Sequence, residues 1–132
     1  MKLKCVIVDD SAVQRMTINK LATSNLQLNL IGEFSNAIEA KRFLSTNPTD
    51  LIFLDIEMPG FSGLEILNFF SEDEVDFSII FITSYNEYAI QAFKLSAIDY
   101  VLKPIEPADL INAVEKYKKQ NSKTNLGSLR TQ

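Results

Sequence analysis

Reactive side chains follow four short apolar runs of the sequence. In chain order they are Asp9 and Asp10 after residues 5–8, Asp55 after 51–54, Thr83 after 79–82, and Lys103 after 100–102. If these runs are neighbouring parallel strands, their carboxyl ends meet at one edge of a sheet, where α/β folds bind their ligands. Three carboxylates, a hydroxyl and an amine are therefore predicted to converge on one small region.

Such a group of side chains is suited to phosphoryl chemistry. Adjacent carboxylates repel one another unless they take up a proton or share a cation, and oxygen ligands without nitrogen or sulfur favour Mg²⁺ or Mn²⁺. Lys103 would add a positive charge, and Thr83 a hydroxyl donor, for a phosphoryl group in transfer. Aspartate is itself a nucleophile in aspartyl-phosphate chemistry, so the residues favour in-line attack by one carboxylate on phosphorus.

Each of these residues has a plainer explanation when it is taken alone. Asp10 competes with Ser11 as the cap of a following helix, Thr83 is a hydroxyl at a strand end, and Lys103 is a solvated charge. The shared position of the reactive residues at the ends of four strands favours a common site over a separate explanation for each residue.

Composition narrows the classes of protein. The chain has 132 residues, of which 46% are hydrophobic, which predicts one domain with a sizeable core. A net charge of -4 argues against non-specific binding to nucleic acid or to an anionic membrane. The sequence contains no histidine, which excludes Ser-His and Cys-His nucleophile pairs, histidine metal sites and a phosphohistidine carrier.

The single cysteine and the short apolar runs indicate the cellular compartment in which the protein is expected. Cys5 lies in an apolar run and is expected to be a buried core residue. One cysteine cannot form a disulfide within the chain, which favours a reducing compartment, the cytoplasm. No apolar run is long enough for a signal peptide or a membrane span.

Short apolar runs alternate with longer amphipathic segments. Residues 5–8, 51–54 and 79–82 are continuously apolar, which is typical of central parallel strands covered on both faces. Residues 26–31 alternate and predict an edge strand, and residues 100–102 predict the last strand. Five repeats of strand and helix follow, so the sequence predicts an α/β fold with one parallel sheet between layers of helices.

Helix start signals lie between the strands. Capping boxes are found at 11–14, 36–39 and 62–65, and Pro107 suits the first turn of a last helix. The core-facing residues of that last helix are predicted to be Leu110, Ile111, Val114 and Tyr117. A looser stripe in the first helix consists of Val13, Met16, Leu21 and Ala22.

The final residues differ from the rest of the chain. Residues 121–132 are polar and carry no helical stripe, so they are predicted to be a linker or tail that leads to an effector domain absent from this chain. The folded domain is accordingly predicted to span residues 1–120.

The combination of motifs resembles the receiver domain of two-component response regulators. The motifs are Asp9-Asp10, the segment 55–60 (DIEMPG), Thr83-Ser84 and Lys103-Pro104, and the resemblance spans residues 2–119. It implies a flavodoxin-like, doubly wound (βα)5 fold with strand order 2-1-3-4-5.

The resemblance also implies a role for each matching residue. Asp55 would be the phosphoacceptor, and Mg²⁺ would be held by Asp55, by Asp10 directly, by Asp9 through water and by the backbone carbonyl of Glu57. Lys103 would bind a phosphoryl oxygen. Thr83 and Tyr100 would be the switch pair, and the Lys103–Pro104 peptide bond would be cis.

A finer resemblance lies in residues 81–110, which look like the receivers of LytTR-class regulators, whose β-rich DNA-binding domain follows the receiver. The implied partner is a sensor histidine kinase. Phosphorylation would switch the face of helix 4, strand 5 and helix 5, for which Tyr88, Lys94, Leu95 and Tyr100 are candidates, and could produce a homodimer. DNA would bind only through the missing domain, and no membrane contact is expected.

Three alternatives stay open at this point. A stand-alone receiver would act by docking on partners. A haloacid-dehalogenase-like phosphohydrolase would be an enzyme, but it carries a second Asp where this chain has Glu57, and it needs a cap over the substrate. A flavodoxin-like electron carrier would need a phosphate loop where this chain has Asp9-Asp10. A receiver domain, unlike the phosphohydrolase, is not expected to turn over a separate substrate.

Overall fold

The computed structural model describes residues 2–26, 28–58, 61–62, 77–84 and 99–131. Within them, five parallel strands form one sheet in the order β2-β1-β3-β6-β7. Their bounds are β1 Lys4–Val8, β2 Asn29–Phe34, β3 Leu51–Asp55, β6 Ser78–Thr83 and β7 Asp99–Leu102. Numbered along the chain, these five strands have the predicted order 2-1-3-4-5 of a flavodoxin-like fold. A short antiparallel hairpin of β4 (Glu57–Met58) and β5 (Phe61–Ser62) follows β3.

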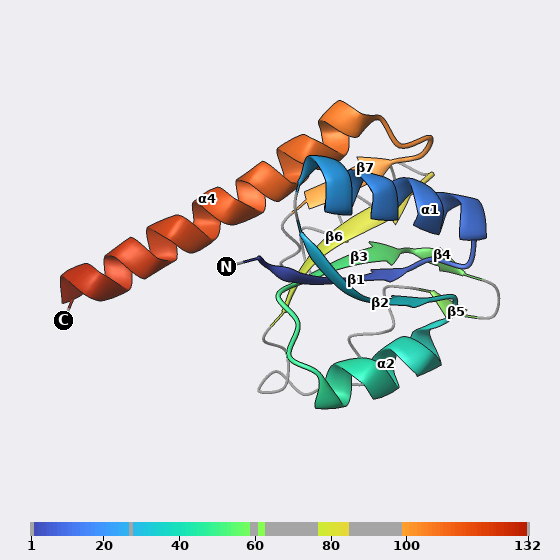
Figure 1. Cartoon of the computed structure of the whole chain (residues 1–132), viewed down its shortest axis with the longest axis horizontal. Coiled ribbons are helices and arrows are strands. Elements are labelled where there is room, and N and C mark those ends of the chain that lie inside the picture. The colour runs from blue at the N-terminus through green and yellow to red at the C-terminus, as the bar shows by residue number, and fades with distance from the viewer. Residues whose placement is uncertain (1, 27, 59–60, 63–76, 85–98, 132) are drawn as a thin grey trace.

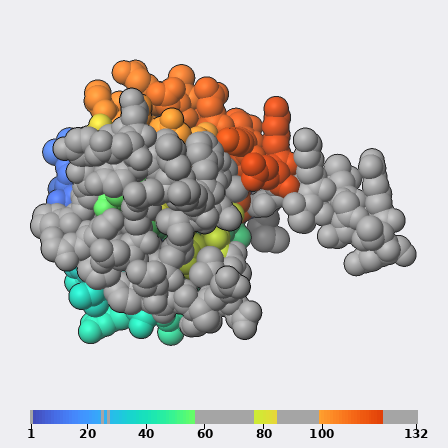
Figure 2. All heavy atoms as spheres, turned by 180° about the vertical axis from the view of Figure 1, so that it is seen from behind, coloured from blue at the N-terminus to red at the C-terminus, as the bar shows by residue number. Residues whose placement is uncertain are grey.

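The described helices cover both faces of the sheet (Figure 1). One face carries α1 (Ala12–Lys20) and α4 (Pro107–Thr131), and the other carries α2 (Ala37–Thr46). Seen from behind, α4 and α2 again lie on opposite sides of the domain (Figure 2). No helix among the described residues combines the length and the apolar character needed to cross a bilayer.

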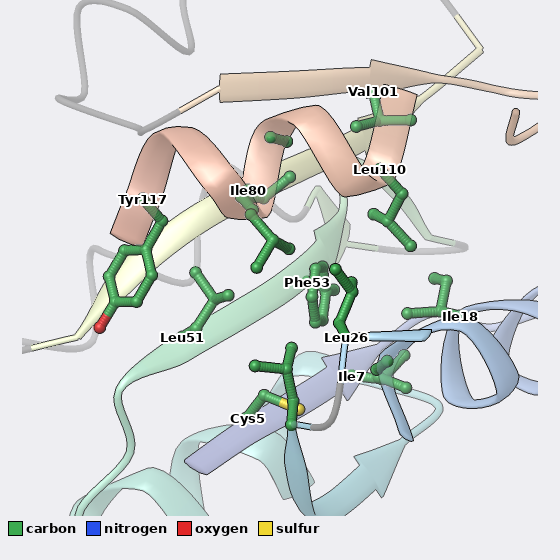
Figure 3. Close-up of a cluster of buried hydrophobic side chains, with 14 of the residues drawn as sticks. Cys5, Ile7, Ile18, Leu26, Leu51, Phe53, Ile80, Val101, Leu110 and Tyr117 are labelled. Atoms are coloured by element: carbon green, nitrogen blue, oxygen red, sulfur yellow. The ribbon is translucent and has the colours of Figure 1, made fainter. Parts of the chain in front are cut away.

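Alternate strand residues supply the two halves of the core. On the side of α1 and α4, Ile7, Phe53 and Ile80 are fully buried, and Figure 3 shows them pointing toward Ile18 of α1 and Leu110 of α4. On the side of α2, the buried strand residues include Val6, Ile52 and Phe81. Central strands are buried on both faces, which is why their sequences read as unbroken apolar runs.

Cys5 belongs to the first of these core layers. Its side chain is fully buried, and burial raises the pKa of the thiol to about 12. The charged thiolate is disfavoured in an apolar environment. Cys5 is therefore a packing residue, as predicted, and is not available as a nucleophile or metal ligand at neutral pH.

Two of the predicted helix caps are present. The backbone N–H of Gln14 donates to Ser11 Oγ at 3.3 Å, and that of Glu39 donates to Asn36 Oδ1 at 2.9 Å. Ser62, the start of the third predicted box, lies in β5. The helix expected after it falls outside the described residues.

The core-facing stripe predicted for α1 is wrong at Val13 and Met16. Val13 and Met16 are each 70% exposed, whereas Ile18 and Ala22 are fully buried. At 3.6 residues per turn, Met16 lies about 200° around the helix from Ile18, so the two face opposite directions. Apolar character alone did not distinguish the core-facing row from the outer row.

The second strand begins three residues later than predicted, at Asn29 instead of Leu26. Leu26 and Leu28 are buried, but their backbone N–H groups donate to Leu21 O at 3.1 Å and to Ala22 O at 2.8 Å. A π-helical turn, η1 (Leu21–Asn25), extends α1. These two leucines therefore follow the C-terminal end of this helix and pack into the core. The strand does lie at the sheet edge, as predicted.

Helix α4 begins at Pro107 as predicted, and Leu110, Val114 and Tyr117 are buried. Ile111 packs against the same cluster with partial exposure. The helical backbone continues to Thr131 and away from the sheet (Figure 1), through residues expected to form a linker or tail. Extending an existing helix avoids the cost of nucleation and needs no apolar stripe. The domain boundary at residue 120 stays a prediction.

Substitutions on the two faces of α1 should differ in their effect on stability. Ile18→Ala should lower the free energy of unfolding by about 2–5 kcal/mol, because it leaves a cavity in the core. Met16→Ala, the matched change on the outer face, should stay within about 0.5 kcal/mol of the original protein. Urea unfolding measures both, and equal losses would contradict the observed orientation of α1.

Candidate functional site

The parallel register brings the reactive residues to one edge of the sheet. Asp55 is the last residue of β3 and Thr83 the last of β6, while Asp9 follows β1 and Lys103 follows β7. Val8 pairs with Leu54, so the next residues, Asp9 and Asp55, are neighbours across the β1–β3 ladder.

The β3–β6 and β6–β7 ladders continue through the residues that follow β3 and β7. The N–H of Ile56 donates to Ile82 O at 3.1 Å, and the N–H of Lys103 donates to Thr83 O at 2.7 Å. Backbone hydrogen bonds of the sheet therefore set the spacing between the segments that carry the site.

Three carboxylates meet at this edge, as the sequence predicted. One carboxylate oxygen from each of Asp9, Asp10 and Asp55 lies within 4.8 Å of the others. Asp9 is 1% exposed and Asp55 is 2% exposed, whereas Asp10 is exposed. The site is thus a buried acidic pocket with an open side at Asp10.

Lys103 lies inside the acidic group. Its Nζ is 3.2 Å from Asp9 Oδ2 and 3.5 Å from Asp55 Oδ2, and its side chain is only 16% exposed. Little water screens these pairs, so each ion pair is stronger than one at the surface. One ammonium compensates only one of three carboxylates, and the remaining negative charge attracts a further cation.

Hydrogen bonds fix Asp9 while leaving one of its oxygens for a ligand. Its N–H donates to Phe34 O at 3.0 Å, and its Oδ1 accepts from the N–H of Ser11 at 2.9 Å. Its Oδ2 is buried and accepts no hydrogen bond from the described residues, although Lys103 lies beside it. A buried carboxylate oxygen in this condition fits a metal ligand, and the all-oxygen set suits Mg²⁺ or Mn²⁺.

The switch candidates occupy the neighbouring strands. Thr83 is fully buried at the end of β6. Tyr100 lies on β7, is partly buried, and packs against the core cluster on the α2 side of the sheet. The Lys103–Pro104 peptide bond is cis.

The backbone of Glu57, whose carbonyl is a predicted metal ligand, lies in β4, two residues after Asp55.

Sequence reasoning missed one residue near the pocket and named three that cannot be placed. Arg15 of α1 donates from Nη1 to the backbone carbonyl of Asp9 at 2.6 Å. The available signal was a cation one helical turn into the helix that follows the Asp9-Asp10 pair. Tyr88, Lys94 and Leu95, predicted for the output face, fall outside the described residues.

Comparison with known proteins identifies the family. The model of the response regulator receiver domain family matches residues 5–115, and the chain belongs to that family. It is therefore the receiver domain of a two-component response regulator, a class that implies interaction with a histidine kinase.

Relatives and solved structures agree with this assignment. The chain is similar to the transcriptional regulatory protein BtsR of Escherichia coli (35% identity, 96% of this chain and 53% of that protein). It is also similar to the sensory transduction protein LytT of Bacillus anthracis (36% identity, 89% and 48%). The response regulatory domain of MrkE from Klebsiella pneumoniae superimposes with a TM-score of 0.78 at 31% identity (89% and 97%). The chain spans about half the length of the curated relatives it matches.

Removal of one carboxylate should weaken cation binding by the pocket. We expect Asp10→Asn to lower the affinity for Mg²⁺ by tenfold or more, equivalent to about 1.4 kcal/mol. Asp10 is exposed, so the replacement should leave the core intact. Isothermal titration calorimetry measures the affinity.

Asp109→Asn makes the same change of charge in the first turn of α4, outside the acidic group, and serves as the control. Equal affinities for the two variants would show that the pocket does not hold the ion.

Proposed function

We propose that Asp55 accepts a phosphoryl group from a sensor histidine kinase while the pocket holds Mg²⁺, or Mn²⁺ in its place. The observation that carries this proposal is the arrangement around Asp55. Its carboxylate lies within 4.8 Å of ligand oxygens of Asp9 and Asp10, and its Oδ2 lies 3.5 Å from Lys103 Nζ.

Asp55 is favoured over the other two carboxylates by its position. Strand β3 is the middle strand of the sheet, so Asp55 has the Asp9-Asp10 pair on its β1 side and Thr83 on its β6 side. A phosphoryl group on Asp55 would lie between the acidic group and the hydroxyl. Asp9 is held through Oδ1 by the N–H of Ser11, and Asp10 is exposed at the rim of the pocket, so neither has this central position.

In the transfer step, an oxygen of the Asp55 carboxylate attacks the phosphorus of the kinase's phosphohistidine. An O–P bond forms as the P–N bond breaks, and the imidazole of the kinase leaves with the electron pair of that bond. Lys103 neutralises charge on a phosphoryl oxygen. Mg²⁺, when bound by Asp9, Asp10, Asp55 and the Glu57 carbonyl, supplies charge neutralisation at the phosphoryl group.

The phosphoryl group would then bias the conformation of the domain. It adds about 1.5 to 2 negative charges, which attract Thr83 and Lys103. Moving an equilibrium from nearly off to nearly on requires about 5.5 kcal/mol of differential binding, and charge-assisted hydrogen bonds supply about 1.5–3 kcal/mol each. Thr83 pairs with Leu102 of β7, the strand that also carries Tyr100, so the pocket and Tyr100 are linked through one ladder.

The output proposed for this switch is control of a LytTR-type DNA-binding domain that follows the receiver in the whole protein. The similarity to LytT and BtsR supports it, because this chain spans about half of each protein. In this proposal the switched face is that of helix 4, strand 5 and helix 5, phosphorylation produces a homodimer, and the protein is cytoplasmic. Action by docking alone, without an attached effector, is the alternative output.

A docking surface for the kinase is proposed on the outer face of α1. A phosphohistidine must approach Asp55 through the open side of the pocket, and α1 begins two residues after the exposed Asp10. Val13 and Met16 present exposed apolar side chains beside that approach. Apolar contacts there would hold the donor's histidine near the pocket.

Phosphorylation by a small donor tests the acceptor directly. After incubation with acetyl phosphate and Mg²⁺, intact-mass spectrometry should find one added phosphoryl group on the original chain and none on Asp55→Asn. Asp109→Asn, which removes a carboxylate outside the pocket, should be modified like the original chain. Equal modification of Asp55→Asn would refute the assignment, and no small phosphate ester should be turned over.

The proposed docking surface predicts a donor-specific defect. Met16→Asp should slow transfer from a phosphorylated histidine kinase by about tenfold, because a charge replaces an apolar contact worth about 1–2 kcal/mol. Modification by acetyl phosphate should not change. Ile38→Asp is the control, because Ile38 is 56% exposed but lies on α2, on the other face of the sheet. Equal slowing by both variants, or slowing with acetyl phosphate, would argue against docking on α1.

A further inference from the structure

Arg15 makes an unusual contact for an arginine on a surface helix. Its side chain is partly buried, and its Nη1 donates to the backbone carbonyl of Asp9 at 2.6 Å. Arginines on helices ordinarily extend their charged heads into water. Here the guanidinium turns back past the start of α1 toward the pocket. A hydrogen bond from a charged donor is shorter and stronger than a neutral one.

The carbonyl that Arg15 binds belongs to the peptide unit that joins Asp9 to Asp10. This unit is planar, so fixing its oxygen also fixes the amide of Asp10 and the direction in which the chain leaves Asp9. The N–H of Asp9 is bound to Phe34 O, and its Oδ1 is bound to Ser11. Lys103 is paired with its Oδ2, and Arg15 adds a contact to the backbone of the turn itself.

The side chain of Asp10 depends on that turn for its orientation. Asp10 is exposed, and its carboxylate has no hydrogen bond or ion pair with the described residues. Its oxygen nevertheless lies within 4.8 Å of the ligand oxygens of Asp9 and Asp55. Sites of this kind need their ligands held within about 0.5 Å. For Asp10, the backbone is what provides that precision.

We propose that Arg15 is a positioning residue for the cation pocket: by holding the Asp9–Asp10 peptide, it aims both carboxylates at Asp55 and raises the affinity for a divalent cation. The inference rests on the proposed function only where it extends to phosphoryl transfer. Removing a residue that supports metal ligands typically lowers affinity by about 10–100-fold.

The positive charge of Arg15 should lower the affinity for Mg²⁺, whereas its positioning role should raise it. The direction of the change in affinity on replacing Arg15 therefore tests the proposal. A cation near the pocket repels Mg²⁺, so a purely electrostatic role predicts tighter binding when Arg15 is neutralised. Because Arg15 is only partly buried, water and salt screen that repulsion. The short hydrogen bond is lost in full. Positioning is therefore expected to dominate.

Three variants separate the contributions. Arg15→Met keeps an apolar stem but removes charge and donor, Arg15→Lys keeps both, and Arg15→Gln keeps a shorter neutral donor. At physiological salt, calorimetry should give Arg15→Met an affinity for Mg²⁺ about tenfold lower than that of the original chain. Arg15→Lys should restore most of it. Arg42→Met, the same change at an exposed position on α2, should bind normally.

Thermal unfolding in EDTA measures the stability of the metal-free protein and so shows whether Arg15 has a merely structural role. If Arg15→Met unfolds earlier but binds Mg²⁺ with unchanged or higher affinity while folded, the proposal is overturned. If Arg15→Met does not fold, the comparison of Arg15→Lys with Arg15→Gln decides. Positioning predicts tighter binding by Arg15→Lys, and repulsion predicts tighter binding by Arg15→Gln, which overturns the proposal.

The outcome can be separated from that of the proposed function. Weaker Mg²⁺ binding by Arg15→Met, together with no phosphoryl adduct on Asp55, would retain the role of Arg15 and remove phosphotransfer. An adduct on Asp55 together with unchanged Mg²⁺ affinity in Arg15→Met would retain phosphotransfer and remove the role of Arg15.

Discussion

Three carboxylates that repel one another lie at one edge of the sheet, and the surrounding structure has to hold them together. Asp9 and Asp55 are almost fully buried, and two buried negative charges side by side are costly unless a cation compensates them. Lys103 lies within 3.5 Å of both. It compensates only part of the charge, and a divalent cation would neutralise the remainder. The same imbalance would be altered by a phosphoryl group on Asp55.

The sheet maintains this unfavourable arrangement because the core beneath it is large and apolar. β1, β3 and β6 are buried on both faces, and their ladders hold the segments that carry the acidic residues side by side. Core layers on both sides of the sheet, of which Figure 3 shows the one beside α1 and α4, prevent the strands from separating to relieve the repulsion. The apolar core thus provides the stability of the fold. At the site, part of the repulsion between the carboxylates is left uncompensated, and a ligand of opposite charge would reduce it. A bound cation and a phosphoryl group would act on the same few groups, which is how chemistry at Asp55 could affect the strand that carries Tyr100.

Much of this arrangement could be predicted from the sequence, because buried parallel strands have a strong signature. Three unbroken apolar runs located the central strands, and a shorter run located β7. The polar residues at the ends of these runs located Asp9, Asp10, Asp55, Thr83 and Lys103. Features set by tertiary packing were not predictable in the same way. The inward face of α1 is defined by Ile18, while the apolar Val13 and Met16 lie outside. The leucines before β2 belong to a helix end, since a strand and a helix terminus can share one short alternating pattern. Arg15 was missed because its partner is a backbone carbonyl, which no pattern of side chains reveals.

Anomalous scattering from a crystal of the protein grown with Mn²⁺ would show whether the acidic residues share one divalent cation. We predict one strong peak in the pocket, bonded to carboxylate oxygens of both Asp10 and Asp55, with Asp9 close by and Lys103 still facing Asp55. A peak bound by only one of these carboxylates, or located elsewhere on the molecule while the pocket stays without one, would contradict it. The converging strand ends would then not form a binding site for a divalent cation.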